Sequence, residues 1–151
     1  MIDTLSYAWL HEAVRWLLTP ALVALLIACA IALVEAGIAA GERFHGLAKL
    51  AATGNLAQVQ SLARHRLERA DLLARIPPML GLMATIIPLG PGLAALGQGD
   101  PAQLASAVTV AFDATVLGLV AGIGGLVIGK LRRRWYEETL EAMELAIEGA
   151  P

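Results

Sequence analysis

Two threonines and one aspartate lie in long apolar stretches of this sequence, where side chains that can bind ions are rare. Thr85 lies in the stretch 76–97, and Asp113 and Thr115 lie in the stretch 104–129. A hydroxyl can donate and accept hydrogen bonds, and a carboxylate can bind a proton or a cation. Because ionisable groups are costly inside a bilayer, such a carboxylate is a functional-site hypothesis. These residues predict that ions move through, or beside, a bundle of membrane helices.

The composition favours a membrane protein over a soluble domain. The chain has 151 residues, of which 58% are hydrophobic and 16% are charged, whereas soluble domains are about 25% charged. A spanning helix needs about 20 apolar residues, and the stretches 16–40, 76–97 and 104–129 reach that length. We therefore predict an all-α membrane protein with three transmembrane helices and helical extensions on the cytoplasmic side.

The basic residues predict the orientation, because Lys and Arg accumulate in cytoplasmic loops. Six lie in the linker 41–75 and four lie in the tail 130–151, which together make ten of the eleven in the chain. The N-terminal segment 1–15 holds only Arg15, and the loop 98–103 holds none. We expect a multi-pass protein of the cell inner membrane. Its linker and tail should lie in the cytoplasm, with the N-terminus and the loop outside.

The segments outside the spans are expected to be helical. Apolar residues recur every three or four positions through the tail, which predicts one helix from about residue 102 to 148. In the linker, Gly54 and Asn55 should separate two helical stretches. Residues 3–16 could form a short interfacial helix that ends before Pro20.

Counting residues predicts where the polar side chains lie within the membrane. At 1.5 Å per residue, Thr85 lies about 14 Å from the inner end of its span, and Thr115 lies about 17 Å from the outer end of its own. The two hydroxyls should therefore share a level near the midplane. Asp113 points about 200° away from Thr115 around the helix. It shares a helix face with Ser106 and Thr109 instead.

Each of these residues also has a structural interpretation that the sequence leaves open. The hydroxyls of Thr85 and Thr115 could bond back to the carbonyl four residues earlier. Asp113 could make one hydrogen bond to a neighbouring helix. Glu35, a further polar position near the end of its span, could reach the inner interface.

Glycines and prolines indicate how the helices pack. Gly118, Gly122 and Gly125 lie close enough in the sequence to form a surface of small residues, which lets two helices approach closely. Pro88 and Pro91 lie in the outer half of the second span and should kink it.

The order of these segments and two short motifs resemble the MotA/TolQ/ExbB family. MLGLMATIIPLG, residues 79–90, is similar to the family's LGLxGT motif in its penultimate span. DATVLGLVAGI, residues 113–123, is similar to its T-x-x-G-L-x-x-A/G motif in the last span. Thr85 and Thr115 fall on the two pore-associated threonines of these motifs.

The sequence departs from the family pattern at two positions. The glycine that precedes the first threonine is Ala84 here. Members of the ExbB type carry a glutamate five residues before the second threonine, where this chain has Val110, and its acid is Asp113 instead. The linker 41–75 is also shorter than in the family.

The resemblance implies an assembly and a function. Five such subunits would surround two helices of a single-span partner similar to ExbD, TolR or MotB, which supplies an essential aspartate. Flow of H⁺ or Na⁺ along a path formed by Thr85, Thr115 and Asp113 would drive mechanical work or transport.

Other function classes compete with this interpretation. The chain could be a small channel or transporter that uses Asp113 alone, or a membrane scaffold that conducts nothing. An enzyme is not expected, because the sequence shows no nucleophile–base pair, no metal-ligand spacing and no phosphate-binding loop. No cofactor, metal ion or nucleic acid is expected either.

Overall fold

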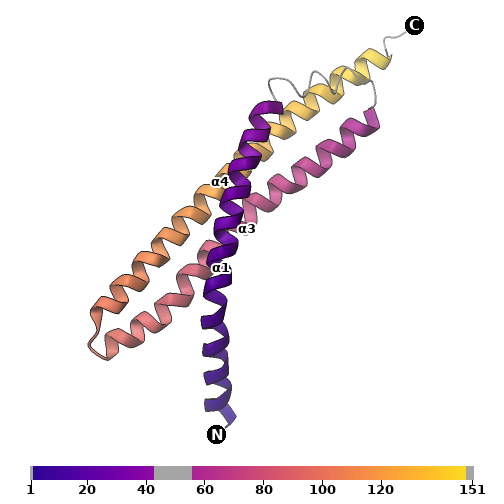
Figure 1. Ribbon diagram of the computed structural model, residues 1–151. Helices are drawn as coiled ribbons and strands as arrows, with labels where there is room; N and C mark the ends of the chain where they lie inside the picture. The colour runs from indigo at the N-terminus through magenta and orange to yellow at the C-terminus, as the bar shows by residue number, and fades with distance from the viewer. Residues whose placement is uncertain (1, 43–55, 149–151) are drawn as a thin grey trace. The chain divides into compact units, whose positions relative to one another are not determined.

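The described part of the chain consists of three long helices. The structure is a computed structural model that describes residues 2–42 and 56–148. Figure 1 shows the helices α1 (Ile2–Gly41), α3 (Leu56–Gly97) and α4 (Pro101–Glu148). Within the described ranges there is no strand, which confirms the all-α class. The predicted break at Gly54 and Asn55 lies outside the described residues.

All three helices are long and apolar enough to cross a membrane. The candidate spans are Glu12–Gly41, Ala57–Gly97 and Pro101–Ala146. All three extend beyond the predicted stretches. The second and third extend furthest, because α3 and α4 each continue from an apolar part into a polar part as one helix. The single helix expected from about 102 to 148 is α4.

Prolines do not interrupt the helices. We expected a separate short helix over residues 3–16, but α1 runs through Pro20 as one helix. Likewise, α3 contains Pro77, Pro78, Pro88 and Pro91. Prolines are tolerated in spanning helices because neighbouring groups satisfy the freed carbonyls.

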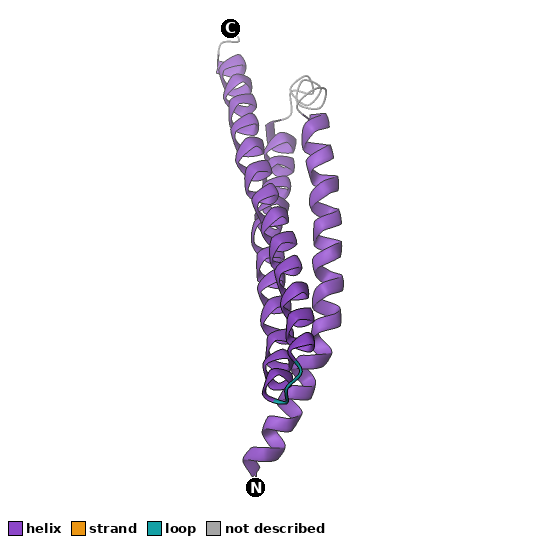
Figure 2. Cartoon of the chain, turned by 90° about the vertical axis from the view of Figure 1, so that its left-hand side faces the viewer, coloured by secondary structure: helices purple, strands orange, loops and turns teal. Residues whose placement is uncertain are grey.

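A tight turn at residues 98–100 joins α3 to α4, as Figure 2 shows. Gly99 has a φ of 85°, a left-handed conformation that favours glycine. The amide of Asp100 donates to the carbonyl of Ala95 at 3.0 Å, which closes the C-terminus of α3. The Asp100 carboxylate in turn accepts from the amide of Gln103 at 3.1 Å and caps the start of α4. The turn therefore fixes α3 and α4 as antiparallel neighbours.

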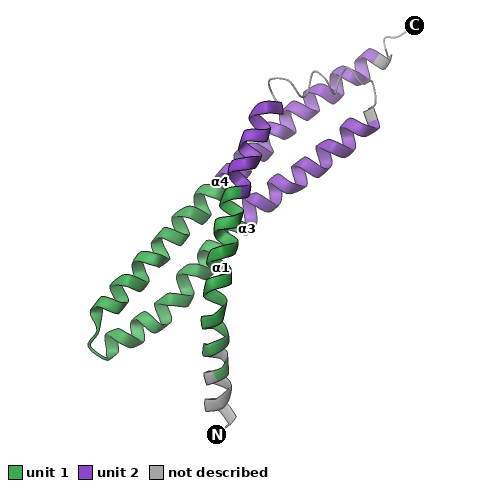
Figure 3. Ribbon diagram, in the orientation of Figure 1, with its two compact units in different colours: residues 1–30, 76–122 green, residues 31–75, 123–151 purple. Residues whose placement is uncertain are grey.

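The chain divides into two compact units, each with contributions from all three helices. Residues 1–30 and 76–122 form the first unit, and residues 31–75 and 123–151 form the second (Figure 3). In the first unit, Leu25 of α1 packs with Ala84 of α3 and Ala114 of α4.

The core of the second unit lies between α3 and α4. Val59, Ala63, Tyr136 and Met143 are buried together there. Both cores include alanines, whose small side chains let the helix backbones lie close together.

Candidate functional site

Glycines bring the backbones of α3 and α4 into contact in the first unit. A Cβ atom added at Gly118 would lie 2.6 Å from the carbonyl oxygen of Pro77. One added at Gly81 would lie 2.9 Å from the carbonyl oxygen of Ala114. Real Cβ atoms do not approach a backbone atom this closely, so only glycine fits the present spacing of the two helices.

This close approach brings the two predicted threonines together. The hydroxyl oxygens of Thr85 on α3 and Thr115 on α4 lie 3.2 Å apart. Threonine side chains are short, so they can meet only where the two helices nearly touch. The residue before each threonine belongs to the core: Ala84 is fully buried and Ala114 is 3% exposed. The hydroxyls themselves are partly buried, at the edge of the three-helix core.

Each hydroxyl also has a carbonyl within reach on its own helix. The Thr85 hydroxyl lies 2.7 Å from the carbonyl oxygen of Gly81 and can donate to it. The Thr115 hydroxyl lies 3.0 Å from that of Ala111. The structural interpretation therefore applies to both residues. Each hydroxyl can nevertheless bind a further group, because a hydroxyl that donates to a carbonyl keeps its lone pairs free to accept a hydrogen bond.

Counting donors and acceptors shows which hydrogen bonds the two hydroxyls can make to a third group. The two hydroxyls carry two hydrogens, and each hydrogen can point to a backbone carbonyl or rotate to a new acceptor. With both hydrogens on carbonyls, the pair presents only lone pairs, which suits a proton donor. With one hydrogen rotated outward, the pair can donate to an anion. A carboxyl group beside Thr85 and Thr115 could thus be hydrogen-bonded in either protonation state.

Enlarging Gly118 is expected to disrupt this arrangement. In Gly118→Ala, the new methyl must push α3 and α4 apart, at a cost of about 1–3 kcal/mol for overpacking. Alanine recovers about 1 kcal/mol of helix propensity, so the net effect should be a lower unfolding temperature in detergent, measured by circular dichroism.

Gly124 on the same helix provides the matched control for that measurement. A Cβ atom there would meet nothing within 4 Å, so Gly124→Ala should leave the unfolding temperature unchanged or raise it. Equal unfolding temperatures for Gly118→Ala and Gly124→Ala would contradict the close packing at Gly118.

The other predicted glycines lie in different surroundings. A Cβ atom at Gly125, in the second unit, would come within 2.6 Å of the backbone of Leu73 and Ala74. Gly122 is buried.

The acid and its helix face point away from the threonine pair. Asp113 is exposed, as are Ser106 and Thr109, the two residues that share its face. The Thr109 hydroxyl donates to the carbonyl of Ala105 at 3.0 Å. Asp113 forms no hydrogen bond or ion pair with the described part of the chain. The structure therefore does not join Asp113 to Thr85 and Thr115 in one site.

Glu35 belongs to a buried ion-pair cluster of the second unit, which sequence reasoning missed. The Arg132 Nη1 atom donates to Glu35 Oε2 at 2.7 Å, and Arg132 Nε donates to Glu42 Oε2 at 3.1 Å. The Arg132 side chain has no exposed surface, and those of Glu35 and Glu42 are 7% and 11% exposed. Arg66 and Arg69 of α3 approach Glu42 and Glu35, respectively. The cluster ties all three helices together.

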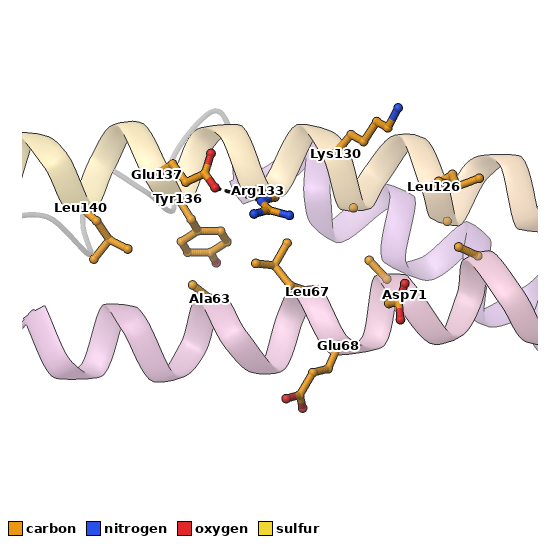
Figure 4. Close-up of a pocket in the computed structure, with 14 residues that line it drawn as sticks. Ala63, Leu67, Glu68, Asp71, Leu126, Lys130, Arg133, Tyr136, Glu137 and Leu140 are labelled. Carbon is orange, nitrogen blue, oxygen red and sulfur yellow. Dashed lines mark hydrogen bonds and ion pairs between the residues drawn. The ribbon is translucent and has the colours of Figure 1, made fainter.

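Tyr136 lies one helical turn from Arg132 and borders a groove of the second unit. The Tyr136 hydroxyl is buried and has no hydrogen-bond partner among the described residues. Figure 4 shows its ring pointing from α4 toward α3, beside Ala63 and Leu67. The groove has a volume of about 540 Å³ and is walled by α3 and α4.

Three helices of spanning length, with two hydroxyls paired between α3 and α4, are typical of a membrane protein that handles ions. The chain has three helices long and apolar enough to cross a membrane, as expected of a multi-pass membrane protein. A family model described as the MotA/TolQ/ExbB proton channel family matches residues 45–145. The chain belongs to this family, whose members are ion-channel-type membrane subunits. No curated protein and no solved structure matches the chain.

Proposed function

We propose that this chain is the ring-forming subunit of a membrane motor or energiser driven by the ion-motive force. Five copies would surround the helices of a single-span partner and conduct H⁺ with it. The observation that carries the proposal is the 3.2 Å separation of the Thr85 and Thr115 hydroxyl oxygens. Membership of the proton channel family supports it.

The proposed mechanism uses the rotation of the two hydroxyls. An aspartic acid on the partner helix, when protonated, would donate to the lone pairs of Thr85 or Thr115. After losing its proton, the same group would accept from a hydroxyl that has turned away from its backbone carbonyl. The hydroxyls would thereby reduce the cost of a charged carboxylate in the low-dielectric interior. Proton loading and release could then alternate beside this pair and drive relative movement of ring and partner.

The helices leave enough uncovered surface for contacts with further copies. Only 22%, 22% and 39% of the residues in the apolar windows of α1, α3 and α4 are buried within one chain. A ring would also enclose the partly buried threonines in a shared interior. We propose an inner-membrane location with the N-terminus outside and the C-terminus in the cytoplasm, in keeping with the distribution of basic residues.

The assembly can be tested by native mass spectrometry. The chain should be co-expressed with a single-span, aspartate-bearing membrane protein encoded beside it and purified in mild detergent. We expect a mass equal to five copies of the chain, and a second species with two partner copies added. A monomer under several detergents, or a ring that never retains the partner, would contradict the proposal.

A self-contained channel and a structural scaffold would differ from the proposed motor subunit in ion flux and in complex formation. A self-contained channel using Asp113 would conduct without any partner, and the exposed face with Ser106 and Thr109 is the observation that favours it. A structural scaffold would form the complex yet show no flux. The proposed role is not enzymatic and requires no cofactor or metal ion.

A further inference from the structure

Asp113 presents a charge on an uncovered face of the first unit. It is exposed on α4, in a segment apolar enough to span the membrane. Phe112 lies next to it and is 66% exposed. A carboxylate facing lipid is costly, and such groups pair with other protein groups. This face therefore needs a cover that offers a cation to Asp113, and the exposed Phe112 beside it can anchor the same cover.

A cation and an apolar site occur together in a hollow of the same unit. The hollow has a volume of about 280 Å³ and is lined by Glu12, Val14 and Arg15 of α1 and by Ile86, Ile87, Gly90 and Pro91 of α3. Arg15 is the single Lys or Arg among the described residues of the first unit. It is exposed and forms no ion pair within the described chain. The hollow thus combines apolar walls with an unused cation.

The two surfaces lie at similar heights in the unit. Asp113 is twelve residues from the start of α4, or about 18 Å along the helix. The hollow residues of α3 are six to eleven residues from its end at Gly97, or about 9–17 Å. The tight turn at 98–100 places these two helix ends side by side. Arg15 lines the hollow together with these residues of α3, so it lies beside them at this end of the unit.

We propose that Phe112 and Asp113 of one copy dock into this hollow of a second copy, with Asp113 paired to the second copy's Arg15. A dry apolar cavity of about 150 Å³ holds a benzene molecule, so a hollow of about 280 Å³ has room for the phenyl ring. Glu12 lies one turn outward from Arg15, and the guanidinium has enough donors for both carboxylates.

The two surfaces are different patches of the same chain, so the contact is head-to-tail. Contacts of this kind generate a closed ring when the rotation between copies closes. A lipid chain could fill the apolar walls but would leave Asp113 unpaired, which favours a protein occupant. This inference rests on the proposed homo-oligomer and specifies one of its contacts.

Crosslinking tests the contact directly. In a Cys29→Ala background, Arg15→Cys and Asp113→Cys are combined in one chain, and membranes are treated with a short bifunctional thiol reagent. A disulfide alone would be too short, because it requires Cβ atoms about 4 Å apart. We expect a ladder of bands up to the full ring. The matched control is Arg15→Cys with Asp113→Ala and Val120→Cys, which removes the same two charges as the test variant. Val120 lies on the same face as Asp113 but about 10.5 Å farther inward, so the control should give no ladder.

A charge exchange gives a second readout. Arg15→Asp or Asp113→Arg alone should lower the fraction of chains in the ring by about tenfold or more, because the contact would then bury two like charges without a partner. The double variant should recover the ring mass. If the wild-type ring forms but the ladder equals the Val120 control, this contact is wrong and the proposed function stands. If no wild-type ring forms, the proposed function itself fails. An intact ring in Asp113→Asn with no proton flux would place Asp113 in the ion path and overturn the pairing.

Discussion

Replacing Arg132 with methionine is expected to lower the free energy of unfolding by about 3–5 kcal/mol, the cost of removing one partner from a buried ion pair. Methionine retains much of the length of the side chain but removes both bonds, 2.7 Å to Glu35 and 3.1 Å to Glu42. Two nearly buried carboxylates then lose their shared cation. Arg66 and Arg69 remain nearby and are partly exposed, so the lower part of this range is expected.

The measurement is unfolding of the purified protein in mixed detergents, followed by circular dichroism. Arg133→Met is the matched control, because Arg133 is 73% exposed and pairs with Glu137 within its own helix. Exposed pairs of this kind contribute about 0–1 kcal/mol. Adding Glu35→Gln and Glu42→Gln to Arg132→Met should recover stability, because no buried carboxylate is then left unpaired and the side chains of Arg66 and Arg69 can reach water. Equal stability of Arg132→Met and Arg133→Met would contradict the buried cluster.

Removing both hydroxyls of the threonine pair is expected to abolish most of the ion-driven output. In the double variant Thr85→Val, Thr115→Val, the shape of each side chain is kept, but no group can donate to or accept from a partner carboxyl. If each hydroxyl contributes about 1.4 kcal/mol to the transfer step, each loss lowers the rate about tenfold. Ring mass should be unchanged, because the lost bonds to Gly81 and Ala111 duplicate backbone hydrogen bonds of the helix.

Two controls separate the hydroxyls from the packing. Thr85→Ser with Thr115→Ser keeps both hydroxyls and should retain output. Thr109→Val removes an exposed hydroxyl that bonds to Ala105 on its own helix, and it should also retain output. The measurement is the cellular phenotype that depends on the motor, compared between variants whose membranes contain equal amounts of the ring. Normal output from both single valine variants would rule out a path along these threonines.

The meeting of the two threonines could be predicted because it depends on simple geometry. The rise per residue of a helix places Thr85 and Thr115 at one level, and the structure brings their hydroxyl oxygens to 3.2 Å. The direction in which they point could not be derived from the rise alone. It depends on the backbone contact at Gly81 and Gly118, which requires knowing which helix faces which.

The buried cluster could not be predicted, because its partners are far apart in the sequence. Glu35 and Arg132 are separated by 97 residues. In the sequence, Arg132 is one of four clustered basic residues, which suggests a charge at the inner membrane surface. The sequence nevertheless holds an indication of it, since Glu35 lies near the inner end of the stretch 16–40 and Arg132 lies just beyond the stretch 104–129. Two opposite charges at the same end of neighbouring spans favour a pair.

The continuity of α1 through Pro20 also differs from the sequence-based prediction, because that prediction did not take the membrane into account. A proline such as Pro20 lowers helix propensity in water, which predicts a boundary. Within a spanning helix, the chain cannot leave a backbone group unsatisfied, so the helix continues. The surroundings of Asp113 could not be predicted from the sequence, because the partner that we propose for it is Arg15 of a second copy.

Proton uptake by sealed vesicles tests the central claim most directly. The purified ring with its single-span partner is reconstituted, a potassium gradient imposes a membrane potential, and an internal pH dye reports proton entry. We predict uptake with the wild-type complex, and little uptake with Thr85→Val, Thr115→Val at the same protein content. Equal uptake by the valine variant and the wild type, or none by an intact wild-type complex, would contradict the account.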